Sequence, residues 1–95
     1  MSKITINRGS DLTLTGTWRD ANGTAMDLTG WTITDYDGHA SMQGNITAQW
    51  VDASQGTYTV TMQWADAMFS GMSFRLRISN GTQDVSSPAI TVIVQ

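Results

Sequence analysis

Polar and apolar residues alternate along three segments of the chain. In residues 11–18 and 57–64 threonines alternate with larger apolar residues, and in residues 72–78 the polar partners are serine and arginine. A period of two places one set of side chains against a core and the other in water, which is typical of half-buried β-strands. The same tendency, more weakly expressed, predicts further strands at residues 3–7, 31–36, 43–51, 82–86 and 89–94.

Residues that favour turns separate the predicted strands. Three dipeptides accept a positive φ angle at low cost, namely Asn22-Gly23, Asp37-Gly38 and Asn80-Gly81. Because Asn80-Gly81 lies between two alternating segments, it predicts a β-hairpin. Within the first segment, Gly16 predicts a bend or a close approach of another group to the backbone.

The chain contains little that favours a helix. Residues 65–70 form the one stretch suited to a helical turn, and Pro88 interrupts the last strand region, as expected at an edge or a bulge. About seven to eight short strands, spaced by 8–12 residues without intervening helices, predict an all-β fold. We therefore expect a single antiparallel β-sandwich domain over residues 1–95.

Composition supports an all-β domain and excludes several functions. All eight acidic residues are aspartate, Lys3 is the single lysine, and the net charge is −3. Four arginines give no basic surface for nucleic acid. No apolar run reaches the ~18 residues of a membrane helix. The N-terminus lacks the apolar core of a signal peptide, so we expect synthesis in the cytoplasm and no contact with a membrane.

The residues that carry chemistry in enzymes are scarce. His39 is the single histidine, and with no cysteine present a zinc site is not expected. The segment Asp35-Tyr36-Asp37-Gly38 resembles the first half of a calcium-binding loop, but an Asp-Gly turn explains it more simply. No nucleophile motif or phosphate-binding loop is present. We therefore predict no catalytic residues, no metal, no cofactor and no enzymatic activity.

The aromatic residues suggest an interaction surface. Trp18, Trp31 and Trp64 share the parity of apolar neighbours and are expected in the core, whereas Trp50 lies on the least apolar strand. Because four indoles are difficult to enclose in a small sandwich, and tryptophan is enriched at interfaces, some of these groups are expected to meet a partner. The alternative is that a spare aromatic merely caps the core. The candidate surface residues are Tyr36, His39, Trp50, Met68 and Phe69.

The first third of the chain resembles an immunoglobulin-like domain of tailed-phage virion proteins, best known at the N-terminus of baseplate upper proteins. In that family a glycine–polar start leads an alternating strand, followed by a short hairpin and an "Asp-Leu-Thr-Gly" segment before the next strand. The matching residues here are Gly9, Asp20, Gly23, Asp27, Leu28, Thr29 and Gly30. At Gly23 and Gly30 the turns favour positive φ, and Leu28 is placed to close one end of the sandwich.

The second half of the chain resembles this family more loosely. Residues 56–62 are similar to its "Gly-x-Tyr-x-Val" strand, and residues 65–71 are similar to its short helical turn. Ala25 stands where the family has a proline, Phe74 stands where it has a tyrosine, and residues 35–50 match no motif of the family. The resemblance covers about two thirds of the chain.

The resemblance implies a structural role in a virion. Such a protein docks on tail, baseplate, fibre or capsid proteins, and as a free-standing copy it is expected to act as an adaptor or a tail-associated component. The alternatives are a capsid decoration protein and a carbohydrate- or receptor-binding module in which Tyr36, His39 and Trp50 stack on a sugar. Three exposed aromatics in one groove favour sugar binding, whereas scattered aromatics beside a free strand edge favour assembly.

Overall fold

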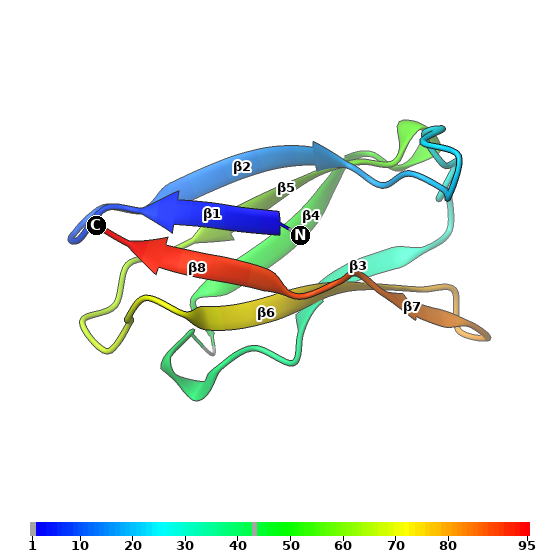
Figure 1. The fold of residues 1–95 in the computed structure, drawn as a ribbon. Helices are drawn as coiled ribbons and strands as arrows, with labels where there is room; N and C mark the ends of the chain where they lie inside the picture. The colour runs from blue at the N-terminus through cyan, green and yellow to red at the C-terminus, as the bar shows by residue number, and fades with distance from the viewer. Residues whose placement is uncertain (1, 43) are drawn as a thin grey trace.

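The computed structural model describes residues 2–42 and 44–95, which form a two-sheet β-sandwich (Figure 1). The larger sheet contains, in spatial order, β1 (Ser2–Ile6), β8 (Ile90–Val94), β6 (Met72–Ser79) and β3 (Thr32–Tyr36), with β7 (Asp84–Ser86) also paired to β6. The smaller sheet contains β2 (Leu12–Thr17), β5 (Thr57–Met62) and β4 (Ile46–Asp52). The all-β prediction is confirmed.

The alternating patterns place the strands as predicted. Along β6 every second residue is buried, from Met72 to Ile78, while the polar residues between them are partly exposed. The segment expected at residues 43–51 begins on Gln43, which lies outside the described residues, and the strand itself is β4. One expectation about direction is wrong, because β1 pairs with β8 in parallel while the other strand pairs are antiparallel.

The last strand region is divided between two elements that lie beside the same neighbour. β7 pairs with the end of β6 and β8 with its beginning, and Pro88 lies between them. The predicted interruption at Pro88 is therefore confirmed. The predicted hairpin at Asn80-Gly81 is also confirmed, since it joins β6 to β7 and the Asn80 N–H donates to the Gln83 carbonyl at 3.2 Å.

The short helical segments lie elsewhere than expected. Two 3₁₀ helices, η1 (Ala40–Met42) and η2 (Ala53–Gln55), follow β3 and β4. Residues 65–70 form a single turn, in which the Met68 N–H donates to the Ala65 carbonyl at 3.0 Å. In the turn after β3, Asp37 rather than Gly38 takes the positive φ, at 53°.

The core has a larger and a smaller part. Between the sheets lies the larger part, whose fully buried members include Ile6, Met62, Phe74, Leu76 and Val92. The smaller part closes the end of the sandwich around Leu28, which is fully buried together with Ile78 and packs with the buried Ile33. Leu28 thus occupies the position expected for it, and its flanking turn has Gly30 at a φ of 86°.

Candidate functional site

Tyr36 ends strand β3 and is exposed, as predicted for a surface aromatic. Its side chain is 39% exposed on the outer face of the larger sheet. The Arg77 guanidinium from neighbouring β6 lies 4.1 Å from the centre of the Tyr36 ring, which is a cation–π contact. Arg77 also approaches Asp84 at 3.8 Å. The face of the ring is therefore partly covered by the chain's own arginine.

His39 and Phe69 form a second exposed pair. Their ring centres are 4.9 Å apart with the planes at 88°, an edge-to-face arrangement. The backbone N–H of His39 donates to the Ser73 carbonyl at 3.2 Å, which fixes the loop after β3 beside the start of β6. Phe69 is 46% exposed in the turn before β6. The sequence placed both residues on the surface but did not predict that they touch.

Met68 was predicted at the surface, and this prediction is wrong. Its side chain is only 3% exposed and belongs to the larger part of the core. The turn at residues 65–70 directs Met68 inward and its neighbour Phe69 outward. Two adjacent apolar residues in a loop do not reveal which of them faces the core, because no strand alternation applies there.

Trp50 is half-buried and held in place, so it is not the free surface aromatic that was expected. Its indole N–H donates to the Trp31 carbonyl at 2.9 Å, and its ring meets that of Tyr58 edge to face at 6.4 Å. The Trp18 ring also meets that of Tyr58 edge to face, with the ring centres 6.5 Å apart. These groups pack around the smaller part of the core, where Trp31 also lies. Trp64 packs against the larger part.

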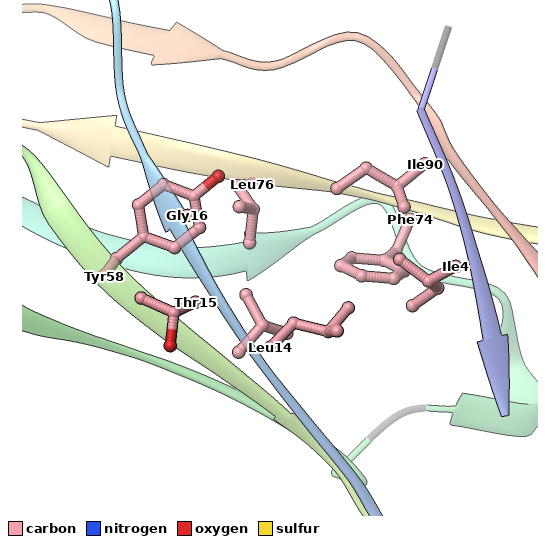
Figure 2. Close-up of a pocket in the computed structure, with 9 residues that line it drawn as sticks. Ile4, Leu14, Thr15, Gly16, Tyr58, Phe74, Leu76 and Ile90 are labelled. Carbon is pink, nitrogen blue, oxygen red and sulfur yellow. The ribbon is translucent and has the colours of Figure 1, made fainter. Parts of the chain in front are cut away.

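A hollow that the sequence did not predict opens between the two sheets. Its volume is about 150 Å³, and it lies at the side of the sandwich where β1 and β8 of one sheet face β2 of the other (Figure 2). We call it the β1–β2 hollow and define it by Ile4, Leu14, Gly16, Tyr58, Phe74 and Ile90. These residues come from five strands and from both ends of the chain, so no local pattern in the sequence predicts the hollow.

Gly16 and Tyr58 shape one end of the β1–β2 hollow. A Cβ atom at Gly16 would lie 2.6 Å from Tyr58 Oη, so the tyrosine ring occupies the space that any other residue would fill. The close approach predicted at Gly16 is therefore confirmed. Burial raises the pKa of Tyr58 above its ordinary value of 10.0. The hydroxyl group thus stays neutral at the wall of an apolar space.

The lining of the β1–β2 hollow determines what it can hold. It is mostly aliphatic and aromatic, and none of its residues is charged. A space of this size and lining accepts about one benzene-sized apolar group. In contrast, the residues that the structure describes bring together no group of three or more His, Cys, Asp or Glu side chains able to hold a metal. Asp37, from the calcium-like segment, lies 3.8 Å from Arg75.

A strand edge without a partner runs along the hollow. β2 pairs only with β5, so its other side carries backbone N–H and C=O groups that no other described strand meets. Within the described ranges, 2–42 and 44–95, no helix is long and apolar enough to cross a membrane.

Comparison with known proteins shows the fold. No family model matches the chain, and no curated protein matches it significantly. Among solved structures, an endo-fucoidan hydrolase of glycoside hydrolase family 107 aligns over 100% of this chain with a TM-score of 0.57 and 18% identity. A single-residue variant of that hydrolase aligns with a TM-score of 0.60 and 18% identity. The chain spans 13% of the length of each.

These structures correct the prediction that the chain is not an enzyme. A segment of similar fold is part of an endo-fucoidan hydrolase chain. The lack of a catalytic motif in a small β-sandwich therefore does not exclude that the sandwich belongs to an enzyme. At 18% identity the similarity establishes the sandwich fold and assigns no activity to this chain.

Proposed function

We propose that this chain is a structural docking domain of a tailed-phage virion, which binds neighbouring tail or baseplate proteins on several sides. The observation that carries the proposal is the distribution of its exposed apolar side chains. Among the described residues, four large ones are between 39% and 61% exposed, and each lies on a different element: Tyr36 on β3, Val51 on β4, Phe69 in the turn before β6 and Val85 on β7. A subunit with several neighbours needs small contact areas on several sides.

The low charge of the surface supports the same role. Many of the exposed residues are threonine or serine, such as Thr13, Thr15 and Thr47, and hydroxyl groups are removed from water at lower cost than charges. The resemblance carried by Gly23, Asp27, Leu28 and Gly30 suggests the virion as the assembly concerned.

The arrangement of aromatics favours docking over sugar binding. A sugar platform would need Tyr36, His39 and Trp50 in one groove. Trp50 instead donates its indole N–H to Trp31 and packs on Tyr58 in the smaller part of the core. His39 lies against Phe69, beside the start of β6.

The test is to locate the chain in purified particles. Phage encoding the chain is separated on a density gradient into particles, free tails and soluble lysate, and the chain is quantified by mass spectrometry after a high-salt wash. We expect a fixed ratio of the chain to the major tail protein. Recovery with tail-free heads would identify a capsid decoration protein instead. Recovery in the soluble fraction alone would refute a virion role.

A further inference from the structure

The edge strands of the two sheets differ in how they are protected. Free edges invite pairing with other chains, and natural proteins block them with charges, inward-pointing carboxylates, bulges or very short strands. Of the five edge strands that the structure describes, four are protected in this way, by Lys3 on β1, the half-buried Asp35 on β3, Asp52 with a register shift on β4, and Asp84 on the short β7.

β2 is the exception among the described strands. It is six residues long, contains no charge or proline, and pairs with β5 in continuous register from Leu12 to Thr17. A free edge of this kind is suited to receive another strand. It is also the edge beside which the β1–β2 hollow opens (Figure 2).

The geometry of β2 relates the edge to the hollow. Leu14, Thr15 and Gly16 of the edge strand all contribute to the lining. Along the strand, Leu14 is half-buried, whereas Thr13 and Thr15 on either side of it are exposed on the other face. A strand that continues the sheet beyond β2 would point every second side chain in the same direction as Leu14, towards the hollow. The side chains between them would continue the outer threonine face and meet water.

We infer that the β2 edge binds an extended segment of a partner protein, with one aromatic or branched aliphatic side chain filling the β1–β2 hollow. The hollow holds one benzene-sized group, and its uncharged lining requires an uncharged anchor. Backbone hydrogen bonds to β2 would supply affinity and the anchor would supply specificity, as in other cases of strand addition. This inference rests on the proposed docking function and names the chemistry of one partner.

A second copy of the chain fits this site poorly. Two β2 edges of six residues would meet along roughly 20 Å, and so narrow a strip covers only a small part of the ~800 Å² per partner that stable interfaces bury. Each copy would also bring only Leu12, Leu14 and Gly16 to the junction on the inner face, and Leu14 and Gly16 already line that copy's own hollow. Both hollows would stay unfilled.

The first test is an unbiased selection of ligands. A displayed library of random ten-residue peptides is selected on the purified domain, and bound peptides are mapped by amide chemical shifts. We expect enriched peptides to alternate polar and apolar residues around one large apolar anchor, and to shift the amides of β2 and β5. Enrichment of peptides that bind elsewhere, or no enrichment, would overturn the inference. Concentration-dependent dimers joined through β2 would also overturn it, because a second copy would then be the occupant.

The second test asks whether the hollow itself, rather than strand β8 in general, is needed for binding. Ile90→Phe fills the hollow from within the chain, while Ile93→Phe makes the same change on the opposite face of the strand. Once equal melting temperatures show that both variants fold, Ile90→Phe should weaken binding of the selected peptide at least about tenfold. Ile93→Phe should bind as the unchanged chain does. Equal binding by both variants would exclude the hollow as the anchor site.

The third test examines the backbone contacts. The N–H groups of every second residue of an added strand face β2, so the selected peptide is N-methylated at alternate residues in two versions. One version should lose binding at least about tenfold, since several hydrogen bonds are lost together, and the other should retain it. Equal effects of the two versions would contradict strand addition. If these tests fail while the chain is found in particles, docking stands and only this site is wrong.

Discussion

Gly16 lies directly beneath the ring of Tyr58, so that a Cβ atom at position 16 would be 2.6 Å from the tyrosine oxygen and 2.7 Å from Cζ. The two residues face each other across the β2–β5 pairing, and both line the β1–β2 hollow. The absence of a side chain at Gly16 allows the ring to lie over the strand and form one wall of the hollow.

Gly16→Ala should therefore destabilise the chain. The added methyl group forces the Tyr58 ring to move, and overpacking of this kind costs about 1–3 kcal/mol in the free energy of unfolding. Urea denaturation of Gly16→Ala, Tyr58→Leu and the double variant measures the coupling. The double variant should be more stable than the sum of the single changes predicts, because leucine removes the clashing atoms. Additive effects would show that the two residues do not interact as described.

Trp50 should matter for stability, whereas Phe69 should matter only for contacts with other molecules. Trp50→Phe removes the hydrogen bond to the Trp31 carbonyl and should lower the free energy of unfolding by about 1–3 kcal/mol. Phe69 is 46% exposed, so Phe69→Leu should change the free energy of unfolding by less than about 0.5 kcal/mol. Denaturation curves of both variants provide the comparison. If Phe69→Leu lowered the free energy of unfolding more than Trp50→Phe does, the roles assigned to these two aromatics would be wrong.

The raised pKa of Tyr58 predicts a loss of stability at alkaline pH. Burial favours the neutral phenol in the folded state, whereas in the unfolded chain the group ionises near 10.0. Its contribution is therefore fully present below pH 10 and is lost as the pH rises from 10 through the folded-state pKa. Melting temperatures measured from pH 8 to 11 should decline less steeply above pH 10 in Tyr58→Phe than in the unchanged chain. Identical declines would show that this phenol is not the group responsible.

Local pattern was sufficient to predict most of the fold. Strand β6 alternates in burial as its sequence alternates, and Asn80-Gly81 forms its hairpin, because both depend on neighbouring residues alone. The parallel pairing of β1 with β8 joins the two ends of the chain, and no local signal specifies its direction.

The candidate site depended on contacts between distant segments, and the sequence predicted it less well. Trp50 shares the parity of Ile46 and Ala48, which indicates burial, but its partner is the carbonyl of Trp31 on another segment. The β1–β2 hollow requires residues from both sheets, such as Ile4 and Ile90, at a fixed separation. Hydrophobic alternation shows which side chains face inward but not whether the two sheets close upon each other at every edge.

Hydrogen exchange of the chain, free and within purified particles, tests the central claim that it docks in an assembly through the open β2 edge. Peptides covering Leu12–Thr17 are compared with peptides from β5, whose two neighbours already pair with it in the free chain. The account predicts that exchange in Leu12–Thr17 slows at least about tenfold in the particle while exchange in β5 changes little. Equal exchange of Leu12–Thr17 in the two states would contradict docking at this edge.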